Sequence, residues 1–440
     1  MSVRRIYWCA AALLVVACAK APVQESFRPL VLSASVEGDA VPKTTLGADF
    51  KTVRWSADDA IAVFSGGNKY TSSSTEILEG TDSKSAKFTF STLDAGASVS
   101  YAVYPASAAV EKYNEGATVV VPTVQTAVAD GFDPAAAVTI AKAGSGSMTF
   151  LNVCAYLAFT IKSEDAASVS SVRIYANEPM TGTADVAWNS GNPTVTFSRS
   201  VSAHTGVLLN GPFESGKTYY VAIYPNTYTG LTFKLTHSTT GYVSTYNTSA
   251  TSLAVARKAN KVIAKDMALR TPTSGQWFEK EPAFIGNDDP VIIVGKSGGS
   301  YKLIKNTDTY YSEAYHAPDA AAATVLGSQV TSAVTADYQW KRHKASDGVY
   351  TLFPVNTTAR RLYCSTTSAS GSQDCMNVGA VPSGDVYRSL FSWDAAGHIF
   401  TAEGDRKRYL SCVDNAWYGE TYPNSGAYPA AVFSFYVQVP

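Results

Sequence analysis

Short stretches of alternating apolar and polar residues recur along most of this chain. Residues 30–36 (LVLSASV), 171–175 (SVRIY) and 231–235 (LTFKL) each alternate with a period of two. Such alternation predicts half-buried β-strands, because successive side chains of a strand point to opposite faces of its sheet. No long amphipathic helical pattern follows the N-terminal segment, so the sequence predicts an all-β protein. Further strands are expected at residues 60–64, 86–90, 98–104, 117–121, 157–161 and 194–197.

Two successive segments of the chain echo each other. Residues 102–105 (AVYP) match residues 222–225 (AIYP), and each phrase ends an expected strand. A strand that stops at proline is expected, because proline lacks the N–H that a sheet ladder needs. The echo predicts two β-sandwich domains of similar design, over residues 30–146 and 147–269.

The last third of the chain contains a three-fold repeat. The predicted units begin about 50 residues apart, at residues 301–304, 350–353 and 399–402. A single unit of this size cannot bury its apolar face, whereas three units around one axis do, so a β-trefoil is expected over residues 281–440 after a linker at 270–280. Each unit ends in aromatic residues that we expect in the core, at 338–340, 391–393 and 433–435.

The N-terminus carries an export signal. Arg4 and Arg5 precede an apolar run, residues 6–17, which is too short to span a bilayer because spanning takes about 20 residues. Cys18 follows Val-Val-Ala and resembles the lipobox cysteine of bacterial lipoproteins. The resemblance implies removal of residues 1–17, a lipid on Cys18 as the membrane anchor, and a tether over residues 18–29. The alternative is an ordinary signal peptide cut nearby, with Cys18 incidental.

Charge and cysteine content narrow the function. The net charge of −1 over 440 residues gives no electrostatic case for nucleic acid. Cys154 lies in an apolar run and is expected to be a free core thiol. Two of Cys364, Cys375 and Cys412 are candidates for a disulfide, with the pairing open. No CxxC pair occurs and the five histidines are scattered, so neither a metal site nor a cofactor is expected.

No catalytic motif appears in the sequence. It lacks HExxH, a nucleophile elbow, a Walker loop and a dinucleotide-binding glycine pattern. Asp58 and Asp59 are expected to accept backbone hydrogen bonds in a turn at residues 56–59. The sequence therefore predicts that the protein is not an enzyme, although a glycosidase with a carboxylate pair needs no local motif and remains an alternative.

Several phrases resemble the fimbrillin-like proteins of Bacteroides-type bacteria. They are residues 53–64 (VRWSADDAIAVF), 101–105 (YAVYP), 150–159 (FLNVCAYLAF) and 258–262 (KANKV). The resemblance covers residues 28–268 and implies two transthyretin-like sandwiches, lipoprotein export to the outer membrane and a role in surface fimbriae. It also implies partner subunits joined by donor-strand exchange, in which a first strand is cut away after an arginine and a neighbour's strand replaces it.

The chain departs from the stalk subunits of that family. Stalk members end in donor strands, whereas here residues 276–440 follow the second sandwich. A terminal or accessory subunit, or a free-standing surface lipoprotein, therefore fits better. Arg28 and Arg54 are the candidate cleavage sites, and Pro29 disfavours cleavage after Arg28.

The trefoil resembles the ricin-type lectin group, which suggests a sugar site on its loops. Sugar recognition needs an aromatic face and nearby Asp or Asn side chains. The best match is Asp414, Asn415, Trp417, Tyr418 and Asn424, although Trp417 as a lid over the core is the alternative. The sequence thus predicts a lipid-anchored adhesin for host or bacterial glycans. The rivals are a stand-alone glycan-capture lipoprotein and a structural subunit whose trefoil contacts protein.

Overall fold

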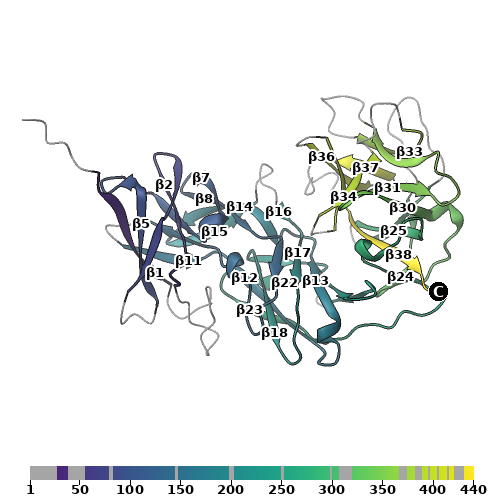
Figure 1. Cartoon of the computed structure of the whole chain (residues 1–440), viewed down its shortest axis with the longest axis horizontal. Coiled ribbons are helices and arrows are strands. Elements are labelled where there is room, and N and C mark those ends of the chain that lie inside the picture. The colour runs from purple at the N-terminus through teal and green to yellow at the C-terminus, as the bar shows by residue number, and fades with distance from the viewer. Residues whose placement is uncertain are drawn as a thin grey trace, which may run out of the picture.

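The regular structure of this chain is nearly all β-strand, as the sequence predicts. Figure 1 shows its computed structural model, in which the sheets follow one another along an elongated molecule, from the N-terminal strands at the left to the last strand at the right. None of the described helices is long and apolar enough to cross a membrane. They are 3₁₀ turns: η1 (Ala106–Ala108), η2 (Pro134–Ala136), η3 (Ala166–Ser168), η4 (Pro282–Phe284) and η5 (Ala336–Tyr338). The structure describes residues 27–37, 55–78, 83–143, 147–197, 203–248, 252–297, 300–306, 320–365, 374–381, 389–394, 397–403, 406–413, 416–420 and 431–440.

The first sheet has eight strands, and the earliest of them, β1, lies in its interior. Strand β1 pairs in parallel with β11 on one edge and antiparallel with β5 on the other. Leu30 and Ala34 are buried while Val31 is 49% exposed, which is the alternation that predicts this strand. The strand order is β3 (Asn68–Thr71), β2 (Ala62–Ser65), β6 (Tyr101–Tyr104), β10 (Thr139–Lys142), β11 (Ser147–Asn152), β1 (Pro29–Val36), β5 (Ser85–Asp94) and β4 (Ser74–Ile77).

Trp55 is a central side chain of the first hydrophobic core. Its ring meets those of Phe88, Tyr104 and Phe150 edge-on, with ring centroids 5.0, 5.2 and 5.5 Å away. Edge-to-face packing suits aromatic rings, because the positive edge of one faces the negative face of the other. These contacts join three strands of the first sheet to the segment that leads into β2.

The turn predicted after Trp55 is confirmed. The Ser56 N–H donates to Asp59 Oδ2 at 2.7 Å, and the Asp59 N–H donates to the Ser56 carbonyl at 3.1 Å. Asp59 Oδ1 accepts a hydrogen bond from the Tyr104 hydroxyl at 2.7 Å. The Asp59 carboxylate therefore holds the turn against β6, and its role is structural.

The next strands mix residues from both sides of the predicted boundary at residue 147. Strand β8 pairs with β14, and β9 pairs with β17, while β11 belongs to the first sheet. A second core forms around Phe159 and Phe233. The sheets are β15 (Asn192–Thr196), β14 (Thr181–Asn189), β8 (Gly116–Val121) and β7 (Ala109–Tyr113), with β16 (Ala203–His204) on β14; β21 (Val243–Asn247), β20 (Thr232–His237), β13 (Val169–Tyr175), β17 (Gly206–Asn210) and β9 (Val124–Thr126); β18 (Thr218–Ile223), β12 (Ala155–Ile161) and β23 (Asn260–Met267); and β19 (Asn226–Tyr228) with β22 (Leu253–Val255).

The strands from β24 to β38 form one continuous sheet of 15 strands, which we call the C-terminal module. Strand β24 begins at Trp277, inside the stretch expected to be linker, and pairs with β38. The order is β28 (Val325–Leu326), β29 (Gln329–Val330), β24 (Trp277–Glu279), β38 (Val432–Gln438), β25 (Pro290–Ser297), β30 (Gln339–Ser346), β31 (Val349–Pro354), β34 (Phe391–Trp393), β35 (Ile399–Glu403), β36 (Arg406–Val413), β37 (Ala416–Glu420), β33 (Asp374–Gly379) and β32 (Arg361–Ser365), with β26 (Ser300–Ile304) joining β25 to β27 (Ala320–Ala322).

The aromatic residues that end each repeat lie in the core of this module, as predicted. Trp340 is fully buried, Phe391 and Phe435 are nearly so, and Trp393 packs against the same core. Residues 301–304, the expected start of the first unit, lie in β26, which folds back on β25, whereas residues 350–353 and 399–402 lie in β31 and β35.

Glu37, the residue after β1, ties the first strand to the segment before β23. Its carboxylate accepts hydrogen bonds from Arg257 Nη1 at 2.9 Å, from Arg257 Nη2 at 3.2 Å and from the Asn152 N–H at 3.2 Å, and it also pairs with Lys258. Burial alone raises the pKa of Glu37, but the hydrogen bonds from Arg257 and Lys258 outweigh it and lower the pKa below its usual value. We call this group the Glu37 clamp.

We expect Glu37→Gln to remove a pH-dependent part of the stability. The pKa of Glu37 in the folded state lies below its unfolded value of about 4.3. The carboxylate therefore stabilises the fold above that pH, and this contribution disappears as the pH falls through the folded-state pKa. Near neutral pH the variant should lose about 1.5–3 kcal/mol, the range for hydrogen bonds to a charged group.

Urea unfolding followed by circular dichroism, from neutral pH to acid, measures this difference. Glu76→Gln is the matched control, because Glu76 pairs with Lys87 on the surface with 68% of its side chain exposed. Equal pH dependence in the parent and in Glu37→Gln would contradict the role of the clamp.

Candidate functional site

Two of the residues predicted to contact a sugar, Trp417 and Tyr418, belong to strand β37 (Ala416–Glu420). In this strand the backbone of Trp417 pairs with Cys412 of β36. A polar loop was expected at Trp417, and this is wrong, because the aromatic segment extends as the second strand of a hairpin. Whether the group contacts a sugar stays a prediction. Asp414, Asn415 and Asn424 lie outside the described residues, as do Cys18 and Arg54.

Of the two predictions for the cysteines, the free core thiol is confirmed and the disulfide is not. Cys154 is a free thiol with no exposed surface, as predicted. Cys364 and Cys412 are thiols in the core of the C-terminal module. Each pairing among the three later cysteines needs one of these two, so the expected disulfide is not formed in this structure. Burial raises the pKa of Cys412 to about 11, which keeps its thiol protonated and unreactive near neutral pH.

Buried charges join the second core to the C-terminal module. Lys234 of β20 places Nζ 2.5 Å from Glu279 Oε1 of β24, with side chains only 12% and 6% exposed. Glu279 Oε2 accepts a hydrogen bond from the Thr245 hydroxyl at 3.0 Å, and Lys234 also donates to Ser434 of β38. Burial lowers the pKa of Lys234, but the Glu279 carboxylate outweighs it and raises the pKa above its usual value. Both charges are therefore paired and hydrogen-bonded.

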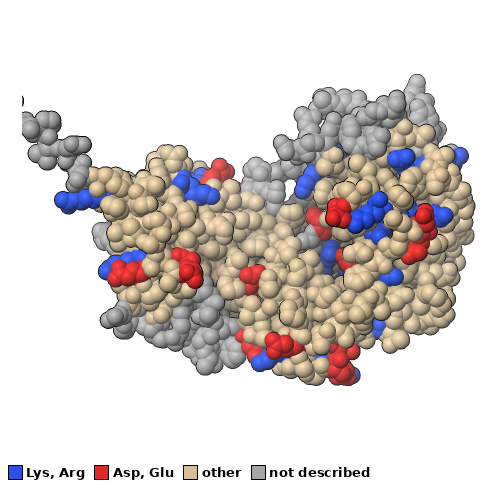
Figure 2. All heavy atoms as spheres, in the orientation of Figure 1, with Lys and Arg blue, Asp and Glu red and all other residues tan. Residues whose placement is uncertain are grey.

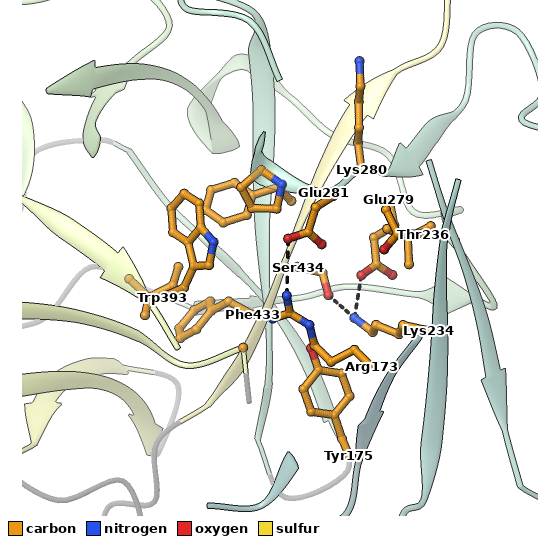
Figure 3. Close-up of a pocket in the computed structure, with 15 residues that line it drawn as sticks. Arg173, Tyr175, Lys234, Thr236, Glu279, Lys280, Glu281, Trp393, Phe433 and Ser434 are labelled. Atoms are coloured by element: carbon orange, nitrogen blue, oxygen red, sulfur yellow. Dashed lines mark hydrogen bonds and ion pairs between the residues drawn. The ribbon is translucent and has the colours of Figure 1, made fainter. Parts of the chain in front are cut away.

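A second ion pair lies beside the first. Arg173 of β13 places Nη2 3.3 Å from Glu281 Oε1, and its Nη1 donates to the Asp394 carbonyl at 3.3 Å. Figure 3 shows Arg173 and Lys234 reaching from the second core toward the acidic side chains of the module, with Trp393 on the far side. We call these two ion pairs the charged joint.

The space among the side chains of the charged joint is too small for an organic ligand. The cavity among its side chains measures about 30 Å³, which is enough for a water molecule or two. Elsewhere, on the face shown in Figure 2, Lys, Arg, Asp and Glu side chains lie in small groups of both signs. The charged joint is therefore a structural contact between the second core and the C-terminal module.

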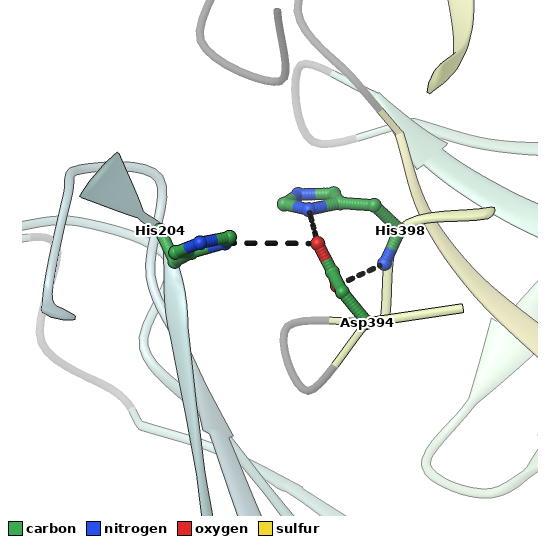
Figure 4. A group of neighbouring side chains, drawn as sticks. All are labelled: His204, Asp394 and His398. Atoms are coloured by element: carbon green, nitrogen blue, oxygen red, sulfur yellow. Dashed lines mark hydrogen bonds and ion pairs between the residues drawn. The ribbon is translucent and has the colours of Figure 1, made fainter. Parts of the chain in front are cut away.

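Two histidines and one aspartate meet at the edge of the same contact. Asp394 Oδ2 lies 3.0 Å from His398 Nδ1 and 3.6 Å from His204 Nδ1. Asp394 follows β34 and His398 precedes β35, both in the C-terminal module. His204 is the last residue of β16, outside the module, and Figure 4 shows the three side chains together. Burial raises the pKa of Asp394, but His398 and His204 outweigh it and hold the pKa well below its usual value.

Sequence reasoning missed both the charged joint and this cluster. Lys234 and Glu279, like His204 and His398, are far apart in the chain and belong to no local motif. Only the Asp394–His398 spacing is local, and it matches no standard metal or catalytic pattern. In the alternating stretch 231–235, Lys234 takes a polar position, so the sequence gives no signal that it is buried.

Comparisons with known proteins found low similarity. No family model and no curated protein matches the chain. Among solved structures, a "putative cell adhesion protein" from Bacteroides ovatus is 11% identical and covers 55% of this chain and 93% of its own, with a TM-score of 0.32. One so described from Bacteroides uniformis is 18% identical over 52% and 90%, with a TM-score of 0.30.

A third solved structure has the same low similarity. It is a fimbrial protein from Bacteroides ovatus, 9% identical over 58% of this chain and 52% of its own, with a TM-score of 0.21. All three TM-scores lie below 0.5, so these matches do not establish a shared fold.

We expect Glu279→Gln to destabilise the contact between the second core and the C-terminal module. The substitution leaves Lys234 buried without its charge partner, which typically costs about 3–5 kcal/mol. The double variant Lys234→Met with Glu279→Gln should recover most of that loss, because no unpaired charge remains. Urea unfolding followed by circular dichroism measures both.

The exposed pair of Lys344 and Asp347 supplies the control. Its side chains are 47% and 98% exposed, so Lys344→Met should leave the unfolding midpoint nearly unchanged. A Glu279→Gln variant as stable as the parent would show that the joint does not depend on this ion pair.

Proposed function

We propose that this chain is a lipid-anchored adhesin of the cell surface, held in the outer membrane through Cys18. In this role it serves as a tip or accessory subunit of a fimbrium, and its C-terminal module binds glycans. The role requires binding and assembly and no catalysis. The place of β1 in the first sheet carries the assembly part of the proposal. The glycan part depends on the sequence alone.

Strand β1 has the placement expected of a strand that a neighbour's strand replaces. It lies between β5 and β11, which are distant from it in the chain, and pairs along both edges. Loss of β1 leaves N–H and C=O groups of β5 and β11 unpaired. It also removes the side chains of Leu30 and Ala34 from the core. A strand from another subunit restores those bonds by β-augmentation.

The strand pairing of the C-terminal module supports a trefoil. Three successive groups of strands start at β25, β31 and β35, the first with six strands and the other two with four each. The first strand of the module's first group pairs with the last strand of its third, β25 with β38, so the groups close on one another. In each group the second and third strands pair with each other, β26 with β27, β32 with β33 and β36 with β37.

The pairing of β38 supports a tip or accessory role over a stalk role. Phe433 and Phe435 place β38 in the core of the module, and it pairs with both β24 and β25. Donating this strand to a neighbour would require the module to unfold. The chain therefore accepts a strand at its first sheet without offering its last one.

The Glu37 clamp favours a second candidate, a stand-alone glycan-capture lipoprotein. Arg257 and Lys258 hold the end of β1 against the segment before β23. In a chain that never assembles, this contact serves to keep β1 in place permanently. The two candidates therefore differ in whether β1 leaves the fold.

We expect an arginine-specific protease to separate the two candidates. Cleavage after Arg54 frees β1 from the rest of the chain, because β1 ends before this residue and Trp55 follows it. In the fimbrial role, the cleaved chain loses residues up to 54, and with them the lipid anchor at Cys18, and then forms complexes with a second subunit. Mass spectrometry and size-exclusion chromatography measure the two steps, with Arg54→Ala as the uncut control. A chain that keeps β1 and stays monomeric after cleavage favours the stand-alone role.

We expect Trp417→Ala to weaken glycan binding by the full chain. A tryptophan at the centre of a binding site is worth about 2 kcal/mol or more, or roughly 30-fold in affinity. Glycan-array binding of the parent and the variant measures this. Leu326→Ala is the control, because Leu326 is 72% exposed in the same module. A folded parent that binds no glycan, or equal binding in Trp417→Ala, favours a structural subunit whose trefoil contacts protein.

A further inference from the structure

We propose that His204, Asp394 and His398 bind a divalent transition-metal ion, of which zinc is the best fit, and that the ion fastens the C-terminal module to the second core. The three side chains come from two parts of the chain and meet where those parts touch. Their ligand atoms lie within 4.8 Å of one another. Sequence reasoning expected no metal site, since the two histidines are far apart in the chain.

The distances between the ligand atoms suit a tetrahedral ion. Zinc lies about 2.0–2.2 Å from histidine nitrogen and carboxylate oxygen, so two ligands of a tetrahedron are about 3.4 Å apart. The distances from Asp394 Oδ2 to the two Nδ1 atoms, 3.0 and 3.6 Å, lie on either side of this value. The two histidine nitrogens are at most 4.8 Å apart, so side-chain shifts bring all three ligand atoms to corners of the tetrahedron, and a water fills the fourth.

The surrounding hydrogen bonds hold two of the ligands as a metal site requires. Asp394 Oδ1 accepts the His398 N–H at 3.0 Å, which leaves Oδ2 to face the histidines. His398 Nε2 lies 3.4 Å from the Thr205 hydroxyl. Metal-binding histidines commonly use their second ring nitrogen in such a bond, which fixes the tautomer and the ring orientation.

His204 supplies the observation that points to an ion. Its Nδ1 is buried and has no hydrogen-bond partner within the described structure. It faces Asp394 Oδ2, which already interacts with His398 Nδ1. Leaving a buried polar atom unsatisfied is costly, and a cation between the three atoms removes that cost, because it accepts electron pairs from both nitrogens and from the carboxylate.

The ligand set defines the class of ion. Two imidazoles and one carboxylate suit zinc and its neighbours in the first transition row, whereas calcium and magnesium prefer oxygen ligands alone. Arg173 lies close by, but its Nη1 contacts the carbonyl of Asp394 and its Nη2 contacts Glu281. The Asp394 carboxylate is therefore left for the ion.

Metal titration of the purified full chain tests this inference. After treatment with EDTA and dialysis, the parent should bind one zinc ion per chain by calorimetry. Cobalt, used as a spectroscopic probe, should give the absorption of a tetrahedral site. His204→Gln and Asp394→Asn each remove a ligand and should weaken zinc binding by at least about 10–100-fold, the loss seen even for partners outside the ligand set.

Two variants and one control keep the test decisive. Asp394 also orders the turn before β35, so Asp394→Asn risks unfolding, whereas His204 Nδ1 has no hydrogen bond to lose. His343→Gln removes an exposed histidine of β30 and should bind zinc like the parent. Zinc should raise the thermal midpoint of the parent and of His343→Gln only. The inference is overturned if the folded parent binds no zinc, or if His204→Gln binds it as tightly.

Discussion

The first sheet depends on backbone hydrogen bonds along both edges of β1. In the strand order, β5 and β4 connect to the other five strands through β1 alone among the described pairings. Without β1, the sheet divides into two smaller sheets with unpaired edges, and such edges attract any available strand. The first sheet, which is nearest in sequence to the proposed membrane anchor, is therefore complete only while β1 or a replacement strand is in place.

The contact with the C-terminal module rests on different physics. There the charges of Lys234, Glu279 and Arg173 are withdrawn from water and paired. Pairs of this kind add little net stability compared with apolar packing, but they penalise any arrangement that leaves a charge without its partner. The joint therefore selects one orientation of the module.

The sequence predicts structure best where neighbours along the chain determine whether a residue is buried. Period-two alternation predicted β1, β13 and β20, and the aromatics around Trp340 predicted the core of the module. Trp417 was misplaced in a loop because the polar residues beside it outweighed its own strand preference. Tyr301 and Tyr350 resemble each other locally, so the sequence places both at the start of a unit, although Tyr301 lies in β26, which folds back on β25.

The proposed metal site could not be predicted, because its residues come together only in the folded chain. His204 and Asp394 meet through the docking of two parts of the chain, and docking leaves no periodic trace in the sequence. The Lys234–Glu279 pair is of the same kind, because each residue alone resembles an ordinary surface charge. The cysteines show the converse error: the export compartment favoured a disulfide, whereas Cys364 and Cys412 are both thiols in this structure.

Exchange of β1 and docking of the module are separable, and this bears on how the chain would work in a fimbrium. Removal of β1 takes with it the Glu37 carboxylate, and so leaves Arg257 and Lys258 without that partner. The contacts of Lys234, Arg173 and His204 involve no residue of the first sheet, so they remain in place. An incoming strand with an acidic residue at the position of Glu37 would restore both the sheet and the clamp. One without it would restore the sheet alone and leave a looser connection to the second core, while the distal module keeps its orientation.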